Sequence, residues 1–155
     1  QKQKQLNFLE AQIDIEREKE LPVVIHAVRA TEKVIQQLKK RPTLTGMSHS
    51  YSGSYEQALQ LIEMGFYISI GGAITYERAK KLRDIARKIP LTSLLIETDA
   101  PDQPDSKHQH HRNEPAYLIE VLTALAELRN DTMEKIAQQT FENTTQLFNF
   151  LNYDK

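Results

Sequence analysis

The sequence predicts an α/β fold in which short parallel strands alternate with helices. Four apolar runs lead to positions 26, 49, 71 and 99, at intervals of 23, 22 and 28 residues. Each interval is the length of one strand, one helix and two short loops. The runs are too apolar for strands with one solvated face, so we expect a buried parallel sheet with right-handed crossovers. An open doubly wound sheet and a closed barrel both fit this pattern.

The first two helices and the first strand are delimited by proline. Apolar residues at helical spacing among charged ones predict an amphipathic helix over residues 1–20, which Pro22 ends. The β-branched run 22–25 predicts a buried strand that ends at His26. A second helix is expected over residues 31–40, with basic side chains in its last turn, where they complement the helix dipole.

The next unit carries clear start and stop signals. A second strand is expected over residues 43–48 and leads to His49. Ser54 is suited to be the N-cap of the following helix, which Gly65 ends. The run 66–70 then predicts the third strand.

The rest of the chain predicts one more strand and three helices. Thr75 is expected to start a basic helix that stops before Pro90, and the fourth strand follows at residues 94–96. A polar loop over residues 102–111 leads into an amphipathic helix. A last helix is opened by residues 131–134, which match a capping box.

Composition excludes several classes of protein and function. The chain has 155 residues, 20 Lys and Arg against 21 Asp and Glu, and a net charge of -1, which excludes nucleic-acid binding by bulk positive charge. It has no Cys, so a metal would be held by His, Asp or Glu. No apolar run approaches the roughly 20 residues of a membrane-spanning helix. We therefore expect a cytoplasmic protein with no membrane partner.

Three potential metal ligands stand at the ends of predicted strands. His26, His49 and Asp99 each follow an apolar run, and ligands of α/β proteins bind at the carboxyl ends of the strands. His and carboxylate ligands suit Zn²⁺, Mn²⁺ or Mg²⁺ and hydrolytic chemistry. A single His at a strand end is more often a loop anchor than a ligand. The repetition at one edge of the sheet favours a metal site.

For other polar segments a functional role is a weaker interpretation than a structural one. The segment 50–54 offers hydroxyl groups, Ser52 among them, and backbone donors to an anion at a helix N-terminus, although capping explains Ser54 equally well. The histidines of 108–111 fit a solvated loop better than a metal site. Arg112 lies where it can reach a substrate phosphate.

Five segments, in order and spacing, resemble the TatD-related metal-dependent deoxyribonucleases. They are Leu21–His26, Gly46–Ser54, Leu94–Pro101, Arg112–Pro115 and Asn143–Phe148. The resemblance implies a TIM (β/α)8 barrel, of which this chain would supply a partial barrel of about four parallel strands with flanking helices. It also implies hydrolysis of DNA phosphodiester bonds with divalent metal ions, two in a complete site.

The resemblance also assigns roles to individual residues. His26, His49 and Asp99 fall on the family's metal ligands, and Asp99 on the catalytic group that accepts a proton from the metal-bound water. Glu97 would orient these ligands without binding the metal itself, or would have a structural role. The residues that would line the substrate face are Ser52, Arg112 and Asn113.

One departure from the family pattern affects activity. The family's His-x-His strand and its bridging Glu would lie upstream of residue 1, so we expect residues 1–155 to form one domain, the C-terminal part of a barrel. Alone it would bind metal weakly and show little activity. Its exposed sheet edges would favour self-association.

Two further functions stay open at this point. A different metal-dependent hydrolase of the same superfamily, an amidase or esterase, has the same ligand set. A non-catalytic α/β module that binds a phosphorylated ligand at Gly71 and Gly72 is the other.

Overall fold

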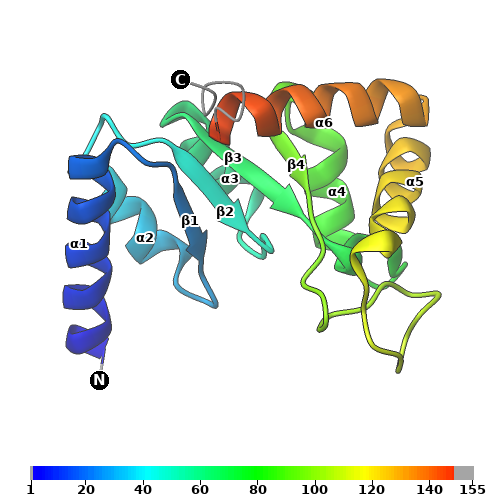
Figure 1. Cartoon of the computed structure of the whole chain (residues 1–155), viewed down its shortest axis with the longest axis horizontal. Helices are drawn as coiled ribbons and strands as arrows, with labels where there is room; N and C mark the ends of the chain where they lie inside the picture. The colour runs from blue at the N-terminus through cyan, green and yellow to red at the C-terminus, as the bar shows by residue number, and fades with distance from the viewer. Residues whose placement is uncertain (1, 149–155) are drawn as a thin grey trace.

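The computed structural model describes residues 2–148 and confirms the α/β fold (Figure 1). Its four-stranded sheet has the order β1-β2-β3-β4, and every neighbouring pair is parallel. The strands are β1 (Val23–His26), β2 (Gly46–His49), β3 (Phe66–Ile70) and β4 (Leu94–Ile96). All carboxyl ends therefore lie at one edge of the sheet, the lower one in Figure 1.

Helices precede, connect and follow the strands. Before β4 they are α1 (Lys2–Lys19), α2 (Thr31–Leu38), α3 (Tyr55–Glu63), the 3-10 turn η1 (Gly72–Thr75), α4 (Lys80–Lys88) and the 3-10 turn η2 (Leu91–Ser93). After β4 they are the 3-10 turn η3 (Pro115–Tyr117), α5 (Leu118–Arg129) and α6 (Met133–Phe148). Ser54 caps α3 in a capping box with Gln57, as predicted for the start of that helix. No helix within residues 2–148 is long and apolar enough to cross a bilayer.

One predicted helix start was wrong. Thr75 does not begin the basic helix: it ends η1, where its hydroxyl donates to the Gly72 carbonyl at 2.7 Å and accepts from the Ser106 amide at 2.8 Å. Because these bonds tie Thr75 to the loop after β4, α4 starts only at Lys80. The predicted opening of the last helix at residues 131–134 is confirmed, since α6 begins at Met133 and Thr132 caps it by accepting from the Lys135 amide at 3.2 Å. The third helical residue is Lys135, which cannot accept from the cap amide, so the full capping box does not form.

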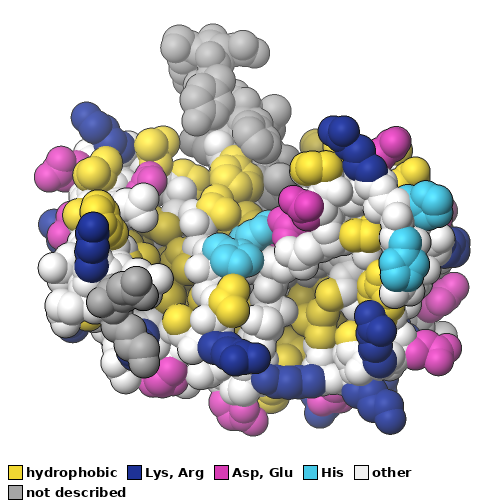
Figure 2. All heavy atoms as spheres, turned by 90° about the horizontal axis from the view of Figure 1, so that it is seen from below, with side chains coloured by type: hydrophobic (Ala, Val, Ile, Leu, Met, Phe, Trp, Pro, Cys, Tyr) yellow, Lys and Arg dark blue, Asp and Glu magenta, His cyan; other side chains and the backbone are white. Residues whose placement is uncertain are grey.

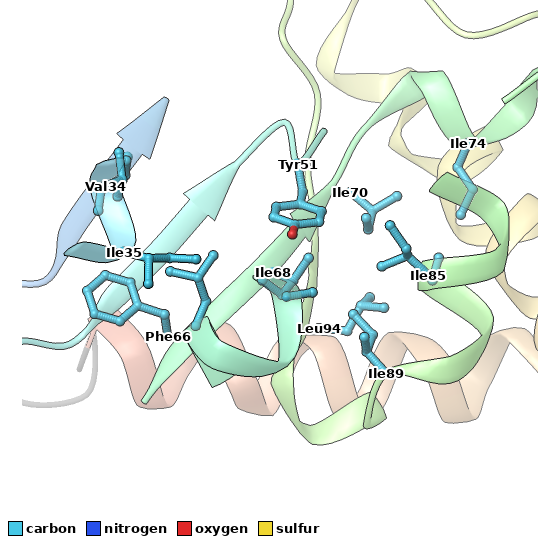
Figure 3. Packing of buried hydrophobic residues seen from close by; sticks show 14 of the residues in the cluster. Val34, Ile35, Tyr51, Phe66, Ile68, Ile70, Ile74, Ile85, Ile89 and Leu94 are labelled. Atoms are coloured by element: carbon cyan, nitrogen blue, oxygen red, sulfur yellow. The ribbon is translucent and has the colours of Figure 1, made fainter. Parts of the chain in front are cut away.

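The main hydrophobic core lies between the sheet and the helices that cover one of its faces (Figure 3). Ile25, Ile68 and Leu94 point to this side from three strands. They pack in one cluster with helix side chains such as Ile35 and Ile85. Fully burying an aliphatic side chain of this size contributes about 1.5–3 kcal/mol, so this face fixes the positions of the strands and of the residues at their ends.

The opposite face of the sheet carries the functional candidates. Its alternating positions include Met47 and Leu95, which pack with Leu147 from α6 in a second, smaller cluster. In Figure 1, α6 crosses the end of the sheet from which the strands start. The opposite end, where the strands finish, is left to polar residues.

Candidate functional site

His26 and His49 are partners in the register of neighbouring strands. Each is the last residue of its strand, β1 or β2, and their rings stand 5.5 Å apart between centroids, with their planes inclined by 44°. The His26 side chain is exposed, whereas His49 is half-buried. Parallel pairing thus brings two predicted ligands side by side at the carboxyl edge of the sheet.

His49 has a carboxylate on each ring nitrogen. Its Nδ1 lies 2.8 Å from Oε2 of Glu97 and its Nε2 lies 2.8 Å from Oδ1 of Asp99. Both carboxylates come from the segment that directly follows β4. The imidazole is therefore held in one orientation by two groups 48 and 50 residues away in sequence.

Glu97 is the most fully engaged of these acids. Besides His49, its carboxylate accepts from the Ser50 amide at 2.7 Å and from the hydroxyl of Ser69, a fully buried residue of β3. The Glu97 side chain is 12% exposed. Glu97 thus contacts three residues at the carboxyl ends of β2 and β3 and orients His49.

Asp99 is held from the loop that it opens. Its second carboxylate oxygen accepts from the Gln103 side-chain amide, and its backbone carbonyl accepts from the Asp102 amide at 2.7 Å. Its side chain is 22% exposed. Asp99 thus faces His49 with one oxygen and solvent-accessible loop atoms with the other.

The remaining predicted residues lie in two places. Asn113 is 4% exposed, and its side-chain amide donates to the carbonyls of Asp102 and Gln103 at 2.7 and 3.3 Å, so it pins the loop that carries Asp99. Arg112 beside it is exposed and forms no hydrogen bond or ion pair within residues 2–148. Ser52, also exposed, lines a separate cavity beyond His26 and His49.

Figure 2 looks onto this carboxyl face. Histidine side chains lie next to acidic ones near its middle, and Lys and Arg side chains gather along the lower part of the view. Further histidine side chains lie to the right, apart from the central group. The face therefore combines potential metal ligands with positive charge at its rim.

The donor types at this site fit a divalent metal. Imidazole and carboxylate ligands suit Zn²⁺ and Mn²⁺, and a carboxylate on the second ring nitrogen, as Glu97 provides, is typical of metal-ligating histidines. The number of donors falls short: within residues 2–148 no group of three or more His, Cys, Asp or Glu side chains is placed to hold an ion. His26, His49 and Asp99 are thus suitable in kind and incomplete as a set.

Sequence reasoning missed the contribution of Ser69 and Gln103. Ser69 stands one residue before the end of the third apolar run, on the same face as His49, so strand alternation alone could have placed it there. Gln103 lies in a loop with no periodic pattern. Its contact with Asp99 could be found only from the structure.

Parallel βα units with His and carboxylate groups at the carboxyl ends of their strands match the placement of active sites in (β/α)8-barrel enzymes. The chain belongs to the TatD related DNase family, whose profile matches residues 1–149. This confirms the family that the sequence motifs indicated.

Two bacterial relatives match almost the whole chain. It is 41% identical over 143 residues to the uncharacterized metal-dependent hydrolase YjjV of Escherichia coli, covering 92% of this chain and 55% of that protein. It is 40% identical over 146 residues to an uncharacterized metal-dependent hydrolase of Haemophilus influenzae, covering 94% and 56%. The chain thus spans about half the length of the curated relatives it matches.

Solved structures agree with the fold. The crystal structure of the YjjV protein of Escherichia coli, a TatD homologue, superposes with a TM-score of 0.90 at 39% identity, over 95% of this chain and 57% of that one. A TatD family hydrolase of Entamoeba histolytica gives a TM-score of 0.81 at 18% identity over the same shares, which supports the fold alone. The four parallel strands are therefore those of a TatD-type TIM barrel.

Proposed function

We propose that this protein is a divalent-metal-dependent hydrolase that cleaves phosphodiester bonds of DNA. Membership of the TatD related DNase family and the names of its bacterial relatives support metal-dependent hydrolysis. The observation that carries the proposal is the position of His49, fixed between Glu97 and Asp99 at the carboxyl edge of the sheet. A divalent ion bound there would lower the pKa of a bound water and polarise a phosphoryl oxygen.

Each residue of the candidate site has its own role in this proposal. His26, His49 and Asp99 would hold the metal, and Asp99 would also accept the proton of the attacking water. Glu97 would keep the His49 ring in place through its contact with Nδ1. Arg112, exposed and without a partner in the described residues, would contact a substrate phosphate.

A complete site would take two metal ions, of which this chain supplies only part of the ligands. The described residues hold no group of three donors in place, and the chain spans about half of its relatives. We therefore expect weak metal binding and little turnover from the 155-residue chain alone.

The test compares substrates and variants. Hydrolysis of bis-p-nitrophenyl phosphate is followed with Mn²⁺, Mg²⁺ or Zn²⁺ added, beside p-nitrophenyl ester and anilide substrates, and metal binding is measured by calorimetry. We expect slow, metal-dependent phosphodiester turnover and metal binding that are both lost in His49→Ala and Asp99→Ala. His110→Ala, in the exposed loop, is the matched control.

Three results would count against the proposal or its parts. Turnover of the ester or anilide without the phosphodiester would favour an esterase or amidase. Fast turnover by the isolated chain would overturn the expectation of weak activity. Metal binding that survives both His49→Ala and Asp99→Ala would remove these residues as ligands.

A further inference from the structure

A polar cavity of about 600 Å³ lies beyond the ends of β1 and β2. It is lined by residues of the loops that follow β1 and β2, by the first turns of α2 and α3, and by one residue of α4. Its polar lining includes Arg29, Glu32, Ser52, Ser54, Gln57 and Lys81. Three successive βα units therefore contribute to one hollow at the carboxyl face.

The cavity is next to the two histidines of the candidate site. Arg29 follows His26 by three residues and Ser52 follows His49 by three residues. Three residues span at most about 10 Å of extended chain. A molecule held at the histidines therefore has this cavity within the reach of its neighbouring groups.

The charge of the cavity favours an anion. Arg29 and Lys81 are exposed, and neither head group forms a hydrogen bond or an ion pair within the part of the chain described. The carboxylate of Glu32 opposes them, but it accepts from the side-chain amides of Gln57 and Gln36, at 3.4 and 3.5 Å. Glu56 of α3 lies outside the lining, but its carboxylate interacts with the Lys81 charge. Arg29 is therefore the cation of the lining without an opposing carboxylate, and it matches the single negative charge of a phosphodiester.

The lining also offers neutral donors. Ser52 is exposed with its hydroxyl free of any hydrogen bond within residues 2–148, while Ser54 uses its Oγ to accept from the Gln57 amide at 3.2 Å. Hydroxyl groups beside Lys and Arg are a common lining of phosphate contacts to nucleic acids. Ser52 can thus complement the two cations.

We propose that this cavity binds a phosphate group of a nucleic-acid strand, next to the phosphate at His26 and His49. Arg29 and Lys81 supply the charge, and Ser52 supplies a hydroxyl donor. The inference rests on the proposed function, because it assumes that the histidines mark the cleavage point. It would make the cavity a site that selects strands over isolated phosphodiesters.

The experiment measures binding without metal, so that hydrolysis does not enter. A short fluorescein-labelled single-stranded DNA is titrated with the chain in chelator, by fluorescence anisotropy, over a series of salt concentrations. The variants are Arg29→Gln, Lys81→Gln and their double variant. Lys80→Gln and Arg87→Gln are matched controls, because both residues are exposed on α4 and lie outside the cavity lining.

We expect each cavity variant to weaken binding about two- to fivefold at low salt, the range of one exposed charge contact. Each should also lower the slope of log affinity against log salt by about 0.7, the value for one phosphate of a single strand. The controls should leave both quantities unchanged. Equal losses in all four single variants would indicate diffuse surface charge and overturn the proposal, as would no loss in any of them.

Two further results separate the sources of phosphate and the two proposals. Inorganic phosphate that displaces the DNA at equal concentration of phosphate groups would make this a free-phosphate site and overturn the nucleic-acid assignment. Binding that depends on Arg29 and Lys81 in a chain without phosphodiester turnover would leave the cavity standing and the proposed function in doubt. Phosphodiester turnover by the chain, together with DNA binding that is unchanged in the cavity variants, would support the proposed function and overturn the assignment of the cavity.

Discussion

The Nε2 of His49 lies 2.8 Å from Oδ1 of Asp99, although β3 lies between β2, which ends at His49, and β4, which precedes Asp99. The contact exists because the chain continues past β4 and turns over the carboxyl edge. Gln103 and Asn113 hold that turn from within the loop. The central pair of the candidate site thus depends on the loop as much as on the sheet.

Glu97 should control the affinity of His49 for a metal. Replacing a carboxylate that orients a ligating histidine typically costs ten- to a hundredfold in metal affinity. We therefore expect Glu97→Gln to weaken Mn²⁺ or Zn²⁺ binding by about ten- to a hundredfold in calorimetry. Glu114→Gln, at an exposed position, is the control. An unchanged affinity would show that Glu97 serves only the packing of the edge.

The sequence was sufficient to place His26 and His49 together. Both follow apolar runs in adjacent βα units, and parallel pairing of these runs places the two residues side by side at the same edge of the sheet. The register of β1 and β2 confirms this. The contact of His49 with Asp99 was beyond sequence reasoning, because the path of a polar loop is set by side-chain bonds such as that of Gln103. The prediction that Thr75 starts a helix was wrong for the same reason, since its hydrogen-bond partner Ser106 is 31 residues away.

Asp105 should stabilise the loop at neutral pH. It is 2% exposed, and its carboxylate lies 2.7 Å from Nδ1 of His108, whose ring stacks on Tyr117. Burial raises the pKa of the Asp105 carboxyl, but hydrogen bonds from His108 and from the Lys107 and His108 amides outweigh it and hold that pKa below its ordinary value of 3.8. The folded state therefore favours the charged form.

The sign of the pH dependence follows from this lowered pKa. The stabilisation is present above the unfolded-state pKa and is lost as the pH falls through the lower folded-state pKa. Asp105→Asn should reduce the free energy of unfolding by about 1–3 kcal/mol at neutral pH, with a smaller difference in acid. Urea titrations at neutral and at acidic pH measure this difference in the free energy of unfolding. Asp102→Asn, at an exposed position, is the control. A difference that grows in acid would contradict the assignment.

Asn143 should be essential for joining α6 to β4. It is 2% exposed, and its side-chain amide donates to the carbonyls of Leu91 and Leu94, both at 2.8 Å. Asn143→Ala leaves two buried carbonyls without this donor, so we expect a loss of about 2–4 kcal/mol in unfolding free energy. Chemical denaturation measures it. Thr145→Ala on the same helix, half-buried and without a side-chain hydrogen bond within residues 2–148, should cost less, about 1 kcal/mol.

The outer edge of β4 should mediate self-association. Ile119 and Phe141 are 48% and 68% exposed, and with Ile96 they line an apolar groove of about 510 Å³ beside this strand. At the other end of the sheet, β1 is also an edge strand and carries the 55% exposed Val24. Unpaired edges flanked by apolar side chains are surfaces on which further strands add.

We propose that a second copy of the chain covers this edge, with β1 of one copy against β4 of the other. Such head-to-tail pairing keeps the strands parallel, and its two unlike surfaces are the heterologous contact that closes into a ring or continues into larger assemblies. Sedimentation velocity should show concentration-dependent association, which Phe141→Ser with Ile119→Ser weakens. Glu142→Ser, exposed beside Phe141, is the control. A chain that stays monomeric over the whole concentration range, or association that is unaffected by the double variant, would exclude this edge as the contact.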